Sequence, residues 1–167
     1  MSKSKYKNYY IGVVIAILII LAILYYFKIY ETAKMKKYAS SYLVSTGAVN
    51  LSIEELKEVK QVFSEAADSY FVFISFTNDV EEYKLENKLK PIIDNYGLKD
   101  IFYFVDTTTY KEDDDLYDKL NETFNLNKDQ VNSIPIIIYF KDKEYKIVDP
   151  NKLENFLEKN DFEKISQ

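Results

Sequence analysis

The sequence predicts an α/β domain, with a mixed sheet flanked by helices, preceded by one transmembrane helix. Three continuous apolar runs, at 70–76, 101–105 and 136–140, are typical of strands covered on both faces. Segments with helical spacing of apolar residues lie between these runs, which favours crossover connections and a parallel core. An uncharged run at residues 9–27 precedes them and has the length of a membrane span.

Residues 9–27 have both the length and the flanks of a membrane anchor. At about 1.5 Å per residue the run forms a helix of roughly 28 Å, close to the hydrocarbon thickness of about 30 Å. A cleaved signal peptide has a shorter apolar region and a small-residue cleavage site, and none follows Phe27. Tyrosines, which suit the two headgroup regions, stand at both ends of the run: Tyr9, Tyr10, Tyr25 and Tyr26.

The charges around this run favour an amino terminus in the cytoplasm. Residues 1–8 form a basic head, and residues 28–47, the predicted juxtamembrane linker, carry a similar number of lysines, so the positive-inside rule is nearly balanced. A lysine-rich head before an early apolar run is typical of a signal anchor. We therefore expect a single-pass cell-membrane protein whose domain, at residues 48–160, is extracytoplasmic; the opposite orientation stays open. Residues 161–167 are expected to form a tail.

The first elements of the domain follow from local patterns. A short strand is expected within residues 44–51. Ser52 and Glu55 have the spacing of a capping box, which predicts that a helix begins at Ser52. Its apolar residues recur at helical spacing as far as Ala66, and the strand at 70–76 follows.

A second helix is predicted after this strand. Asp79 and Glu82 repeat the capping-box spacing, and Gly97 suits the carboxyl-terminal end of the helix. Pro91 lies inside it, where a proline usually kinks or ends a helix. The apolar run at 101–105 then forms the next strand.

The last elements include a hairpin. Three aspartates at 113–115 open a third helix, and 136–140 is the third buried strand. A turn at 142–143 leads into residues 145–148, whose alternation suits a strand nearer the edge. Asp149 and Pro150 then begin a final helix, as an N-cap followed by proline.

Composition excludes several classes of function. Residues 29–167 carry all 27 acidic residues but only 18 of the 22 basic ones, a net charge of −9, which disfavours nucleic-acid binding. The chain contains no histidine and no cysteine, which removes most metal, haem and nucleophile–base sites, and its three glycines form no phosphate-binding loop. We therefore expect no enzyme activity, no metal and no small-molecule cofactor. The abundance of Lys, Ile, Tyr, Asn and Phe favours a low-GC bacterial source.

Two segments resemble thioredoxin domains. Residues 133–144 resemble the Ile-Pro strand and hairpin that close those domains, and 70–76 resembles the strand before their active site. The resemblance covers residues 48–160. Within the family, the chain is similar to membrane-linked proteins of the bacteriocin-transport accessory type. It implies a thioredoxin-like fold.

The resemblance does not extend to the catalytic cysteines. The family's Cys-x-x-Cys motif would fall near Glu81 and Lys84 if strand ends are aligned, or on Tyr83 and Glu86 if Pro91 is aligned. Because a thiolate is the nucleophile of disulfide exchange, this chain is expected to be catalytically inactive.

The resemblance also implies a cis Ile134-Pro135 bond and a groove that binds an extended peptide or protein partner. A trans bond stays open as the ordinary alternative. Two other functions also stay open: a structural subunit or scaffold of a membrane complex, and a redox accessory whose thiols come from a partner. The groove residues are expected to be Thr77, Asn78, Asp79, Val80, Ser133, Ile134 and Pro135.

Overall fold

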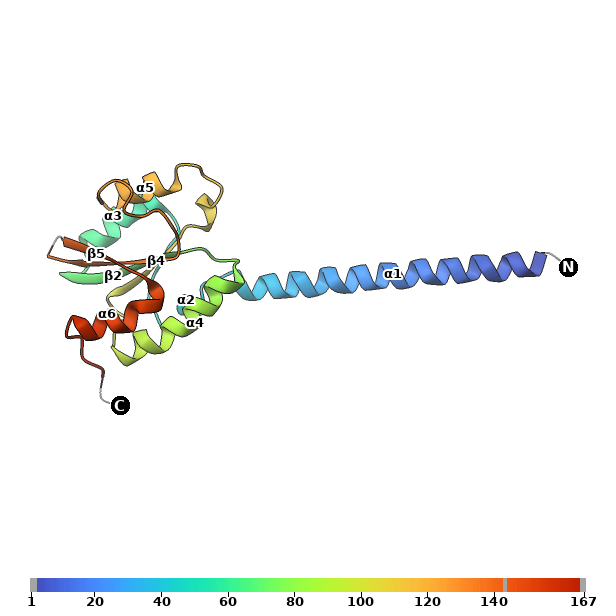
Figure 1. Ribbon diagram of the computed structural model, residues 1–167, viewed down its shortest axis with the longest axis horizontal. Coiled ribbons are helices and arrows are strands. Elements are labelled where there is room, and N and C mark those ends of the chain that lie inside the picture. Colours follow the sequence, from blue (N-terminus) through green and yellow to red (C-terminus); the bar gives the residue numbers. More distant parts are fainter. Residues whose placement is uncertain (1–2, 143, 166–167) are drawn as a thin grey trace. The chain divides into compact units, whose positions relative to one another are not determined.

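The computed structural model describes residues 3–142 and 144–165, without the side chains of 3–8 and 34 (Figure 1). It divides the chain into two compact units, Met1–Lys37 and Tyr38–Gln167. The division falls at residue 38, inside the segment that the sequence assigns to a linker.

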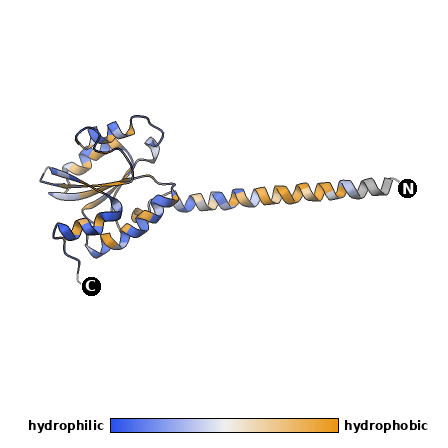
Figure 2. Cartoon of the chain, viewed as in Figure 1, coloured by the Kyte–Doolittle hydropathy of each residue, from blue (hydrophilic) through white to orange (hydrophobic). Residues whose placement is uncertain are grey.

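The first unit is most of one long helix, α1 (Lys3–Tyr38). Its stretch Tyr9–Tyr38 is long and apolar enough to cross a membrane, and none of its most apolar part is buried within the protein. Figure 2 shows the apolar residues concentrated along the middle of the helix. Beyond residue 27 the helix continues into the predicted linker and ends at Tyr38.

The second unit is built on a five-stranded mixed sheet with the order β1-β3-β2-β4-β5. The first three strands are parallel, β4 is antiparallel to β2, and β5 is antiparallel to β4. This order and these directions are those of a thioredoxin-like fold, as the resemblance implies. The strands are β1 (Ser52–Ile53), β2 (Ser69–Ser75), β3 (Phe102–Asp106), β4 (Ile136–Lys141) and β5 (Glu144–Val148).

Helices cover both faces of the sheet (Figure 1). Successive residues of a strand point to opposite faces, so Phe71 and Phe73 of β2 belong to one apolar core and Val72 and Ile74 to the other. The first core includes residues of α2 (Tyr42–Ser45), α4 (Val80–Asn95) and α6 (Leu153–Lys159). The second includes residues of α3 (Leu56–Ser64) and α5 (Leu116–Thr123), and short 3₁₀ helices lie at Thr108–Tyr110 and Pro150–Lys152.

The predicted capping box at Ser52 is wrong. Ser52 and Ile53 form β1, which pairs with Phe104 and Val105 of β3, and α3 begins only at Leu56. Ile53 is 2% exposed. Parallel pairing and burial of this side chain therefore override the local helix-start pattern, and the first strand begins just after the expected 44–51.

Candidate functional site

The predicted groove lies where β2 passes into α4 and where β4 begins. Antiparallel pairing places Ile136 of β4 opposite Ile74 of β2, so the residues just before β4 and just after β2 leave the sheet at the same edge. The Ile134-Pro135 peptide bond is cis, which confirms this part of the prediction. Asn78 and Ser133 are exposed at this edge.

Thr77 is fixed by the end of β3. Its main-chain N–H donates to the Thr108 hydroxyl (2.7 Å), and its own hydroxyl donates to the Asp106 carboxylate (3.0 Å). The Thr107 N–H also donates to the Ser75 carbonyl (3.0 Å). Thr77 is 8% exposed. It therefore supports the junction between β2 and α4, and its main-chain donor is used inside the domain.

Asn78 turns the chain between β2 and α4. Its φ of 60° lies in the left-handed region, which asparagine tolerates better than most residues. Its main-chain N–H donates to the carbonyl of Tyr38, the last residue of α1 (2.7 Å). A residue from the predicted linker therefore reaches the predicted groove.

Asp79 caps α4, as the sequence predicts. Its carboxylate accepts from the N–H groups of Glu81 (2.8 Å) and Glu82 (3.3 Å), and Val80 opens the helix. The Glu82 side chain instead accepts from the hydroxyl of Ser75 (2.8 Å). Asp79 thus supplies the cap, while the Glu82 side chain binds the end of β2. The helix continues through Pro91 to Asn95.

The positions expected for the family's cysteines contain no nucleophile under either alignment. Glu81 and Lys84 are exposed and form an ion pair (2.7 Å). The Tyr83 ring contacts the rings of Tyr38 and Tyr42, with centroids 5.0 and 5.2 Å apart. Glu86, the other position, is 1% exposed.

Glu86 joins α4 to the segment that follows α1. Its Oε2 atom accepts from the Ser41 hydroxyl (2.6 Å) and from the Leu43 N–H (2.9 Å). Burial raises the pKa of Glu86, and the hydrogen bonds from Ser41, Leu43 and Tyr42 oppose the rise. The buried carboxylate therefore serves as a polar anchor for residues 41–43.

Glu82 and Glu86 are four residues apart on α4. Burial also raises the pKa of Glu82, the hydrogen bond from Ser75 opposes the rise, and the charge of Asp79 adds to it. The charge of Glu82 contributes to the raised pKa of Glu86. These carboxylates can bind protons and accept hydrogen bonds, and they cannot carry electrons. In the part of the chain that the structure describes, no cluster of three or more acidic residues could hold a metal ion.

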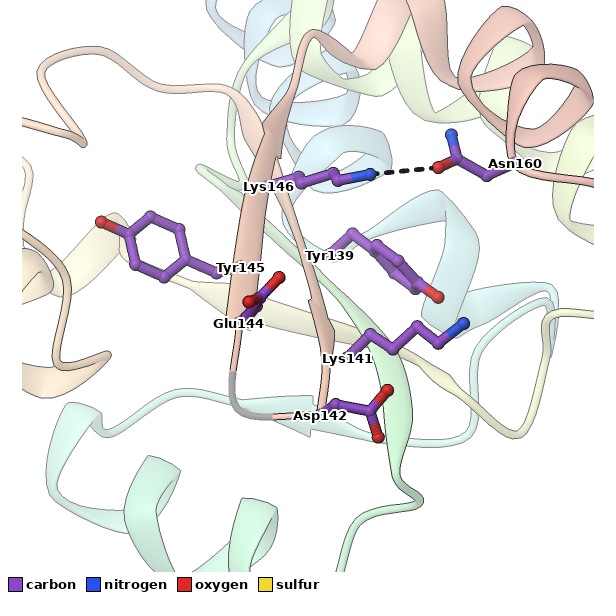
Figure 3. Close-up of a pocket in the computed structure, with 7 residues that line it drawn as sticks. All are labelled: Tyr139, Lys141, Asp142, Glu144, Tyr145, Lys146 and Asn160. Carbon is purple, nitrogen blue, oxygen red and sulfur yellow. Dashed lines mark hydrogen bonds between the residues drawn. The ribbon is translucent and has the colours of Figure 1, made fainter.

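A separate cavity of about 380 Å³ lies at the β4–β5 hairpin, at the other end of β4 from Pro135 (Figure 3). Lys146 donates to the Asn160 side chain (3.2 Å), and Figure 3 shows Tyr145 pointing away from these two residues. The lining contains both lysines and acidic residues, so it favours neither sign of ligand charge. It consists of Tyr139, Lys141, Asp142, Glu144, Tyr145, Lys146 and Asn160.

Residues 38–43 are the part of the site that sequence reasoning missed. Their partners Asn78 and Glu86 lie about forty residues further along the chain. The local signal is the apolar pair Leu43 and Val44, which no helical apolar stripe continues.

Comparisons with known proteins find partial similarity to solved structures. No family model matches the chain, and no curated protein matches it. A designed protein of known crystal structure is 19% identical, with a TM-score of 0.46, over 66% of this chain and 91% of its own. The thioredoxin Mala s 13 of Malassezia sympodialis is also 19% identical, with a TM-score of 0.43, over 65% of this chain and 87% of its own. It is the sheet order and the strand directions that make this domain thioredoxin-like.

Proposed function

We propose that this chain is a membrane-anchored, thiol-free thioredoxin-like domain that binds an extended segment of a protein partner at the edge formed by residues 77–80 and 133–135. One observation carries the proposal. Among the residues that the structure describes, none forms a hydrogen bond with the main chain of Ser133 or Ile134. Main-chain groups without a partner inside the protein can pair with the main chain of an extended segment, while side-chain contacts give specificity.

The chemistry of the chain supports binding rather than catalysis. Thiol–disulfide exchange needs a thiolate, and the sequence has no cysteine. The expected motif positions hold an ion pair, a tyrosine and a buried carboxylate instead. A role as a redox accessory would require all thiols to come from the partner.

Membrane anchorage by α1 is part of the proposal. A membrane-impermeant maleimide tests the orientation on a clean background, because the natural chain has no thiol. In a Lys128→Cys variant, an exposed position of the domain, we expect labelling in intact cells. Labelling only after lysis would place the domain in the cytoplasm.

A scaffold role is the second candidate. The apolar stretch of α1 is not buried within the protein, so it offers a surface to lipid or to another transmembrane helix. A complex that survives changes in the groove but requires residues 9–27 would favour this role.

Substitution in the groove tests the binding role. Ser133→Lys places a long charged side chain at the exposed edge, and Ser64→Lys makes the same exchange at an exposed position at the end of α3. We expect Ser133→Lys to abolish partner capture and Ser64→Lys to leave it unchanged, with both variants folded. Equal capture by the two variants would refute the groove.

A further inference from the structure

The segment that follows α1 lies against the proposed groove. We call residues 38–46 the cover segment; it contains the end of α1 and all of α2. At one end, the Tyr38 carbonyl accepts from the Asn78 N–H (2.7 Å). The contact is therefore made with a groove residue through the main chain, which is also the group that an extended partner would use.

Three further kinds of contact hold the cover segment in place. The Ser41 hydroxyl and the Leu43 N–H both donate to Glu86. The Leu43 side chain is 0% exposed in the core beneath α4. The rings of Tyr38 and Tyr42 contact Tyr83. The cover segment is thus fixed to the first turns of α4 by polar, apolar and aromatic contacts together.

The Asn78 donor can serve only one of two acceptors. A main-chain amide has a single hydrogen, and in this structure the Tyr38 carbonyl accepts it. An extended partner can pair with Asn78 only after Tyr38 has withdrawn. By contrast, the Thr77 donor is held by Thr108 of the domain itself and does not depend on the cover segment.

We propose that the cover segment is a built-in competitor for the groove: release of residues 38–46 from Glu86 and Tyr83 frees the Asn78 main chain for an extended protein partner. The partner's role in this competition rests on the proposed function. Because Tyr38 is the last residue of α1, the segment that must move is directly continuous with the apolar helix.

Amide-resolved hydrogen exchange tests the proposal without any partner. The measurement uses the full-length chain in detergent micelles and follows the amides of Leu43, Asn78 and Thr77. Glu86→Ala removes the acceptor of two hydrogen bonds, each charge-assisted, so we expect the exchange of Leu43 and Asn78 to accelerate together by about tenfold or more. The Thr77 amide should stay within about twofold of its original rate, because Thr108 holds it. Faster exchange at Leu43 with an unchanged Asn78 would overturn the proposal.

A milder variant keeps the test decisive if Glu86→Ala loosens the whole domain. Tyr42→Ala removes one ring contact with Tyr83, and we expect a rise of about threefold to tenfold in the same two amides. Tyr117→Ala, at a partly exposed position on α5, is the matched control and should change neither. Unchanged exchange at Asn78 in Tyr42→Ala would also overturn the proposal.

Photo-crosslinking then separates this inference from the proposed function. With a photoreactive residue at position 133 in native cells, release of the cover segment by Tyr42→Ala should increase the yield of the cross-linked partner. If Asn78 exchange rises but no partner is cross-linked in either form, the proposed function fails while the opening of the cover segment stands. If a partner is cross-linked but Asn78 exchange does not respond, the cover segment is not the competitor.

Discussion

Leu43→Ala tests whether the residues just after α1 belong to the folded domain. Leu43 is 0% exposed and lies in the core formed by α2, α4, α6 and the sheet. Truncation of a fully buried leucine removes its transfer free energy and leaves a cavity, which together lower the free energy of unfolding by about 2–5 kcal/mol. If Leu43 belonged to a free linker, the substitution would leave the free energy of unfolding unchanged.

Leu51→Ala is the matched control, because Leu51 is 40% exposed and the exchange is chemically identical. The assay is urea unfolding of the full-length chain in a mild detergent, followed by near-ultraviolet circular dichroism of the tyrosines. With a slope of about 2 kcal/mol per molar urea, the Leu43→Ala midpoint should fall by about 1–2.5 M. The control should shift much less. Midpoints for the two variants within about 0.3 M of each other would refute the placement of Leu43 in the core.

Three further predictions follow from the described contacts. The raised pKa of Glu86 means that the folded state binds this proton more tightly than the unfolded state, so the free energy of unfolding falls as pH rises from about 4.5 through the folded-state pKa. Glu86→Gln should make the urea midpoint depend less on pH across that window. A pH dependence identical to that of the natural chain would contradict the burial of the carboxylate. Phe162→Ala removes a ring whose centroid lies 5.6 Å from that of Phe71 and 5.9 Å from that of Tyr139. Thermal unfolding should show that the free energy of unfolding falls by about 2 kcal/mol. No fall would mean that residues 161–165 do not pack on the domain. Because it has no thiol, the purified chain should not accelerate the reduction of insulin by dithiothreitol in a turbidity assay. A clear acceleration over dithiothreitol alone would contradict a purely binding role.

The strands were the easiest elements to predict. The runs at 70–76, 101–105 and 136–140 coincide closely with β2, β3 and β4, because strands with both faces covered are apolar at every position. The N-cap at Asp79 could also be predicted from a short stretch of sequence, because its carboxylate accepts from N–H groups within three residues. Such features depend on short stretches of sequence.

The errors arose where distant residues override local preference. Ser52 has the spacing of a helix start, yet pairing with β3 makes it a strand. The cover segment has no helical apolar stripe that predicts its burial, and its contacts with Asn78, Tyr83 and Glu86, together with the buried Leu43 side chain, bring it into the domain. These contacts join segments more than forty residues apart, and no local pattern encodes them.

The hydrogen bonds around the proposed groove could be predicted only in part, for the same reason. The Ile-Pro segment and the junction after β2 were identified from the resemblance to thioredoxin domains. The hydrogen bonds of Thr77 to Thr108 and of Asn78 to Tyr38 were not, because they depend on how the sheet edge meets the segment after α1. Two of the predicted groove residues therefore have their main-chain donors in use within the domain.

Photo-crosslinking in native cells is the most direct test of the central claim. A photoreactive residue at position 133 lies at the proposed groove, and one at position 64, also exposed, lies at the end of α3 and serves as the control. We predict a discrete cross-linked protein from position 133 and not from position 64. The product should be lost in a groove-blocked form that combines Asn78→Lys with Pro135→Ala. No cross-linked protein from position 133 in a folded, membrane-inserted chain, or the same product from both positions, would contradict a binding groove at this edge.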